Sequence, residues 1–151
     1  MRHARLGLAS LGLALLATAQ GHAQGKPLPP PASDAMPPVE LTITMDGGKP
    51  VCAPAELRLP ADTNIALHVV STANAPVTIT APGQFENAHV LHADGDLVHV
   101  ASEKGYLMKR GGQGTLRLRT LAAGDHSFAC TSTADKNAPF IGKLVLVPPA
   151  G

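Results

Sequence analysis

The 151-residue chain carries 12 Lys and Arg against 11 Asp and Glu, which gives a formal net charge of +1, and it contains three Phe, one Tyr and no Trp. The near-neutral charge, without a block of like charge, argues against nucleic acid or an anionic membrane as the main partner. The few aromatic side chains argue against stacking platforms for bases or sugars.

The N-terminal segment, residues 1–23, has the pattern of a signal peptide. Arg2 and Arg5 precede a short apolar run, and two small-x-small sequences, at residues 17–19 and 21–23, fit the cleavage rule. The apolar run is too short and too rich in Gly and Ala for a comfortable membrane span. We therefore expect a periplasmic or secreted protein with no membrane span after cleavage.

A proline-rich linker is predicted for residues 24–38. Its six prolines disfavour both helix and central strand, and they favour an extended, solvated tether. The remaining residues, 39–148, are predicted to form one domain, because this length is typical of a single core.

Short β-strands separated by turns are predicted along residues 39–148. Residues 39–45 alternate apolar and polar side chains, and residues 65–70 are apolar on both faces, as expected of a central strand. Residues 115–120 place Leu116 and Leu118 on one face and charged or polar side chains on the other. Seven or eight such strands, with no helical periodicity between them, predict an all-β protein built as a β-sandwich.

The two cysteines of the chain, Cys52 and Cys130, have two alternative roles. In an exported chain they most simply form a disulfide, which would close a long loop. The functional alternative is a thiolate metal ligand or a redox pair.

Two stretches resemble the cupredoxin domain of EfeO-type periplasmic iron-uptake proteins. Residues 51–63 resemble its opening C-x-P-x-x-L-x-V-x-A-G-x-T. Residues 124–130 and 142–145 resemble its closing G-x-Y-x-M-x-C and G-K-L-I-V. The resemblance covers about residues 39–147 and implies an eight-stranded Greek-key β-sandwich, a periplasmic address and a link to iron or copper.

The usual copper ligands are missing from the positions that this resemblance assigns to them. In cupredoxins the loop after the Cys supplies a His and then a Met, whereas residues 131–141 contain neither. The stretch 75–79, where another His is expected, has no His and none of the acidic residues of EfeO-type domains. Only Cys130 matches a ligand position. We therefore expect no type 1 copper, which needs two His and one Cys.

A candidate metal site comes from a hairpin expected around Asp94-Gly95. With these two residues as the loop, His92 and His99 become diagonal neighbours on one face. Glu103 extends that face and is the nearest counterpart of the acidic EfeO-type ligands, and Met108 offers a soft ligand for copper. The structural alternative is a solvated hairpin face whose histidines bind nothing.

The sequence thus predicts a cupredoxin-like periplasmic protein that binds or delivers copper or iron, accessory to metal uptake or homeostasis. Its expected partners are the metal ion and an envelope metal transporter or other periplasmic protein. No nucleophile elbow, HExxH motif or phosphate-binding loop is present, so we expect a protein that is not an enzyme, with a ferroxidase as the catalytic alternative. The second hypothesis is a metal-free β-sandwich that docks another envelope protein.

Overall fold

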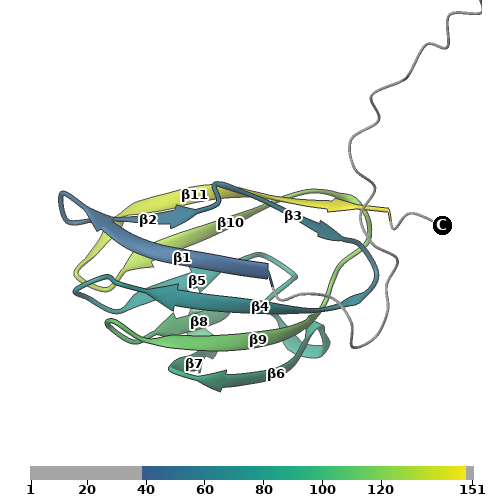
Figure 1. Cartoon of the computed structure of the whole chain (residues 1–151), viewed down its shortest axis with the longest axis horizontal. Helices are drawn as coiled ribbons and strands as arrows, with labels where there is room; N and C mark the ends of the chain where they lie inside the picture. The colour runs from purple at the N-terminus through teal and green to yellow at the C-terminus, as the bar shows by residue number, and fades with distance from the viewer. Residues whose placement is uncertain (1–38, 149–151) are drawn as a thin grey trace, which may run out of the picture.

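A computed structural model, which describes residues 39–148, shows two β-sheets packed face to face (Figure 1). The first sheet has the strand order β2-β1-β4-β9-β6, and the second has the order β3-β11-β10-β5-β8-β7. The strands are β1 (Val39–Asp46), β2 (Lys49–Ala53), β3 (Glu56–Pro60), β4 (Asn64–Ser71), β5 (Val77–Thr80), β6 (Val90–Gly95), β7 (Leu97–Val100), β8 (Gly105–Met108), β9 (Gln113–Arg119), β10 (Gly124–Ser132) and β11 (Asp135–Val147). Two short 3-10 helices, η1 (Asn87–His89) and η2 (Ala101–Glu103), complete the elements. The predicted all-β sandwich is confirmed.

The core lies between the sheets and is built by alternation along the strands. In β9, Leu116 and Leu118 are buried while Arg117 and Arg119 are exposed. In β10, Phe128 and Cys130 are buried in the same way. The strand β4, which the sequence predicts to be central, lies between β1 and β9. Alternation therefore assigns the inward and outward faces of these strands correctly.

A disulfide joins the two sheets. Cys52 of the edge strand β2 is bonded to Cys130 of the inner strand β10, across a sequence separation of 78. Both side chains are buried, with 1% and 0% of their surface exposed. The prediction that the two cysteines form a disulfide is confirmed.

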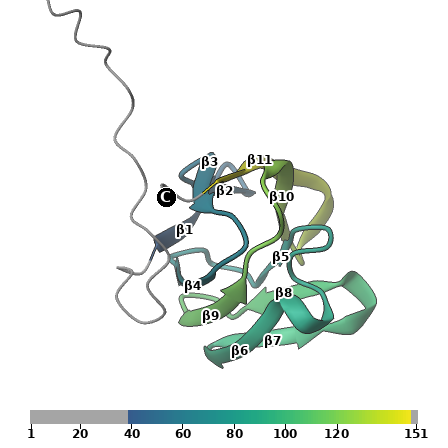
Figure 2. The ribbon, with the colours of Figure 1, turned by 90° about the vertical axis from the view of Figure 1, so that its right-hand side faces the viewer.

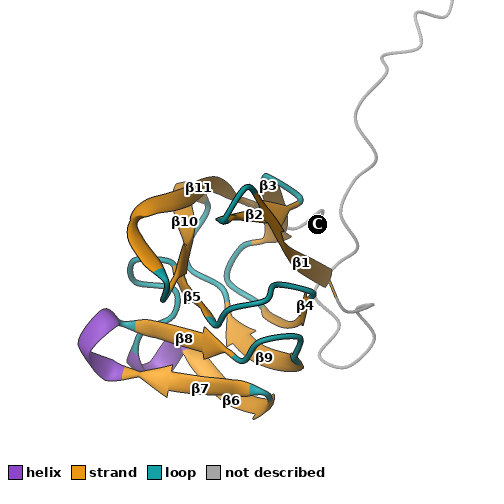
Figure 3. Cartoon of the chain, turned by 90° about the vertical axis from the view of Figure 1, so that its left-hand side faces the viewer, coloured by secondary structure: helices purple, strands orange, loops and turns teal. Residues whose placement is uncertain are grey.

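The predicted hairpin around Asp94-Gly95 is wrong. The strands β6 and β7 flank this turn, but β6 pairs with β9 in the first sheet, and β7 pairs with β8 in the second. The turn thus carries the chain from one sheet to the other, and Figures 2 and 3 show β6 and β7 together at one side of the sandwich. Burial explains this arrangement, because Leu97 is buried and Ala93 packs against the core, so both strands turn an apolar side inward.

Within residues 39–148, no helix is long and apolar enough to span a membrane. The predicted signal peptide and linker fall on residues 1–38, outside the described residues. Those two segments therefore stay predictions.

We expect removal of the disulfide to lower the free energy of unfolding. Closure of a loop of this length stabilises the folded state by about 4–5 kcal/mol in the chain-entropy model, and removal of native disulfides costs about 2–5 kcal/mol. The measurement is urea denaturation of the Cys52→Ala/Cys130→Ala variant and, separately, of the native chain under reducing conditions. A change below about 1 kcal/mol in both would show that the bridge contributes little.

Thr120 provides a second test of the fold. Its buried hydroxyl donates a hydrogen bond to the Pro60 carbonyl at 2.7 Å and accepts one from the Thr63 amide at 3.0 Å, which ties the turn before β4 to the end of β9. We expect Thr120→Val to lower the unfolding free energy by about 1–3 kcal/mol, because both partners lose a buried hydrogen bond. The matched control is Thr44→Val at an exposed position, and an equal change in both variants would contradict the assignment.

Candidate functional site

The structure does not bring the predicted metal ligands His92 and His99 together. His92 lies exposed on β6 and faces outward from the first sheet, opposite Arg117 of β9. His99 lies exposed on β7 in the second sheet, opposite Tyr106. The ring centroids of His99 and Tyr106 are 5.2 Å apart. The two imidazoles therefore occupy separate places and share no face.

Met108 is a core residue. It lies on β8, opposite Val77 of β5 and Leu97 of β7, and none of its surface is exposed. Its thioether therefore fills space between the sheets and is not exposed to solvent in this packing.

Glu103, the fourth predicted ligand, is engaged by neighbouring side chains. A hydrogen bond from the Thr78 hydroxyl and the ammonium group of Lys136 both lower the pKa of its carboxyl. The Lys136 Nζ lies 3.3 Å from the Glu103 carboxylate oxygen. The carboxylate is therefore ionised at neutral pH and already has a cationic partner.

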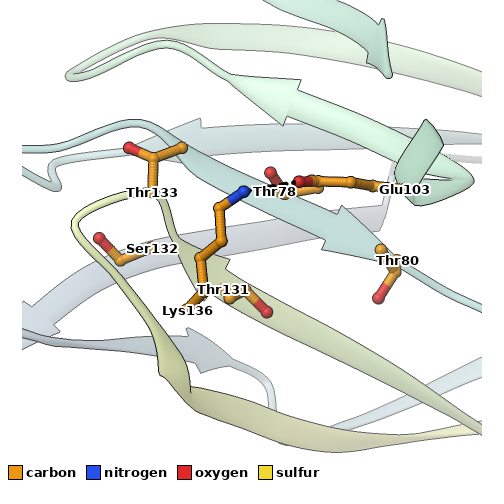
Figure 4. A pocket seen from close by; sticks show the side chains of 7 residues that line it. All are labelled: Thr78, Thr80, Glu103, Thr131, Ser132, Thr133 and Lys136. Carbon is orange, nitrogen blue, oxygen red and sulfur yellow. Dashed lines mark hydrogen bonds and ion pairs between the residues drawn. The ribbon is translucent and has the colours of Figure 1, made fainter. Parts of the chain in front are cut away.

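A small polar pocket surrounds this ion pair (Figure 4). It has a volume of about 160 Å³, and its lining residues are Thr78, Thr80, Glu103, Thr131, Ser132, Thr133 and Lys136. Hydroxyl groups and one ion pair suit hydrogen bonding to a small polar molecule, and no imidazole or thiol lines the pocket. Of these residues the sequence analysis identified only Glu103, as a candidate metal ligand, and it missed the threonines, Ser132 and Lys136.

The pocket lies over the segment that follows Cys130, where the family resemblance expects copper ligands. In this chain the segment continues as a tight β10–β11 hairpin, in which Ser132 pairs with Asp135. Cys130 itself is bonded to Cys52. The residues present therefore do not fit a type 1 copper centre, which needs a free Cys thiolate and two imidazoles.

No group of three or more His, Cys, Asp or Glu side chains in residues 39–148 is placed to hold one metal ion. The rings of two other histidines form hydrogen bonds with residues of β9. His68 Nδ1 lies 3.1 Å from the Thr115 hydroxyl, and His89 Nδ1 lies 3.2 Å from the Arg119 carbonyl oxygen. His126 is half-buried, and its Nε2 is buried without a hydrogen-bond partner among the described residues.

Neither a protein-family model nor a curated protein matches this sequence. Solved structures do match. The laccase-like multicopper oxidase CueO from Ochrobactrum sp. aligns with a TM-score of 0.54 at 12% identity, over 82% of this chain and 33% of that one. The copper nitrite reductase of Thermus scotoductus aligns with a TM-score of 0.52 at 9% identity, over 75% and 31%. A multicopper oxidase of Pediococcus acidilactici aligns with a TM-score of 0.51 at 10% identity, over 77% and 27%.

These comparisons overturn the prediction that the chain is not an enzyme, because the solved structures that share its fold are mostly copper enzymes. The chain spans about a third or less of each of these three proteins, and an identity of 9–12% relates it to their fold alone. The EfeO-type resemblance stays a prediction. The chain has the cupredoxin-type β-sandwich fold.

Proposed function

We propose that this chain is an exported protein that binds copper ions on its surface imidazoles, in place of an interior type 1 centre. The observation that carries the proposal is the pair of exposed histidines, His92 and His99, on a fold shared with copper proteins. Neutral imidazole is a good ligand for Cu(II), and an N-ligand site binds Cu(II) more tightly than Fe(II). The chemistry therefore favours copper over iron.

The separation of the two histidines supports two independent sites. His92 has Asp94 two residues further along the same outward face of β6, and both side chains are exposed. His99 has the Tyr106 ring beside it. A site with one imidazole and, at His92, one carboxylate holds copper loosely and releases it readily. Such sites suit delivery of copper to a periplasmic protein or an envelope metal transporter better than long-term storage.

The second candidate function is a metal-free interaction domain that docks another envelope protein. One observation favours it: Leu91, Val98 and Ile141 expose 53%, 47% and 64% of their surface. Large apolar side chains with this exposure gain free energy when a partner covers them. A copper titration distinguishes this function from the first.

We expect the native chain to bind more Cu(II) than variants that lack the exposed histidines. His92→Ala and His99→Ala should each remove one weak site, and the double variant should remove both, because the two imidazoles lie on different sheets. The measurement is isothermal titration with Cu(II), supported by electron paramagnetic resonance for nitrogen coordination. Binding left intact in the double variant would contradict copper handling by these histidines and leave the interaction domain as the working function.

Two further variants serve as controls in this titration. Glu103→Gln and Met108→Leu change the other two predicted ligands, and we expect neither to alter the copper stoichiometry. Glu103 is paired with Lys136, and Met108 is enclosed in the core. Loss of a site in either variant would show that the ion is held elsewhere than on the exposed imidazoles.

A further inference from the structure

Two arginines on β9 form an exposed cationic pair. Arg117 and Arg119 alternate with the buried Leu116 and Leu118, so both guanidinium groups project from the outer face of the first sheet. Residues two apart in a strand are separated by about 6.6–6.8 Å on the same face. We propose that this face is a docking surface for a protein partner that presents two carboxylate side chains at a spacing similar to that of the two arginines.

The strands on either side of β9 leave these arginines without an acidic neighbour. Arg117 lies opposite Ala66 of β4 and His92 of β6, and Arg119 lies opposite Asn64 of β4. The Asn64 Oδ1 accepts a long hydrogen bond of 3.5 Å from Arg119. Neither arginine forms an ion pair with a carboxylate of residues 39–148. We call the surface formed by Asn64, Ala66, His92, Arg117 and Arg119 the β9 face.

Two acidic residues near the β9 face in register, Asp94 and Glu40, form no ion pair with its arginines. Asp94 lies opposite Thr115, whose backbone amide donates to the Asp94 carboxylate at 3.1 Å. Glu40 lies on β1, in register with His68 of β4, and β4 separates it from β9. Within residues 39–148, therefore, Arg117 and Arg119 have no carboxylate partner.

Three other cations of the described chain are paired with carboxylates, whereas four, like the two arginines, form no ion pair within residues 39–148: Lys49, Lys109, Arg110 and Lys143. Arg117 and Arg119 differ from these four because they lie two residues apart on one outward face of a strand. Arg58, Lys104 and Lys136 each form an ion pair with a glutamate, at 3.0, 3.5 and 3.3 Å. An arginine fork binds a carboxylate through two parallel hydrogen bonds, which gives both affinity and orientation. Two guanidinium groups without a carboxylate partner, two residues apart on one strand face, therefore match a partner with two carboxylates at a similar spacing.

A protein partner fits this surface better than a polyanion or an anionic membrane. The formal net charge of the whole chain is only +1, so its overall field does not attract an extended negative surface. The attraction is confined to one pair of guanidinium groups. Binding to discrete carboxylates depends on such local charges and weakens as salt screens them.

The test uses the full chain and a fluorescein-labelled peptide in which Glu alternates with Thr, compared with the same peptide carrying Gln for Glu. Fluorescence anisotropy should show binding of the Glu peptide only, and its affinity should fall at high salt. In the variant Arg117→Gln/Arg119→Gln we expect the affinity to fall by about tenfold or more.

The matched control is Lys109→Gln/Arg110→Gln, which removes two exposed positive charges from the turn before β9 and leaves the β9 face intact. We expect less than about a twofold change in this variant, because distant exposed charges are screened. An equal loss of affinity for the Glu peptide in the two double variants, or no binding of that peptide by the native chain, would overturn the proposal. Binding to phosphatidylglycerol vesicles with the same dependence on Arg117 and Arg119 would overturn it in favour of a lipid surface.

Discussion

The disulfide between Cys52 and Cys130 joins an edge strand of one sheet to an inner strand of the other. The bridge restricts the unfolded chain and fixes how the two sheets meet near β2, β10 and β11. It also uses Cys130, the side chain that the resemblance to cupredoxins places at a copper ligand position. The bond that stabilises the sandwich is therefore the same bond that removes a thiolate ligand, and the segment after Cys130 is free to continue as a plain hairpin.

Much of the fold could be predicted from the sequence, because alternation reports which side of a strand is buried. It placed Leu116 and Leu118 inward and identified β4 as central, as observed. Alternation does not report which strand is the neighbour. The segment around Asp94-Gly95 has a strong hairpin signal, yet β6 and β7 pair with β9 and β8 in separate sheets. These strand partners bury Leu97 of β7 in the second sheet and pack Ala93 of β6 in the first sheet against the core. No local sequence pattern indicates this choice of partners.

The candidate metal site failed as a cluster for the same reason. The prediction that His92 and His99 converge required them to share a face, and the change of sheet at Gly95 removed that condition. Met108 and Tyr106 lie two residues apart in β8 and are both buried, so alternation could have assigned Met108 to the core. The pairing of Glu103 with Lys136 joins residues 33 apart in sequence, and neither residue alone signals it.

The two proposals meet at one pair of residues, because His92 and Arg117 are directly opposite on neighbouring strands. Side chains in such pairs lie close enough to interact. A Cu(II) ion on His92 is therefore repelled by the Arg117 guanidinium, and this repulsion weakens copper binding. A partner carboxylate that binds Arg117 neutralises this charge and relieves the repulsion. Because coupling between two ligands is reciprocal, copper on His92 must in turn favour the acidic partner. If both proposals hold, the geometry of this strand pair makes copper loading and docking mutually reinforcing.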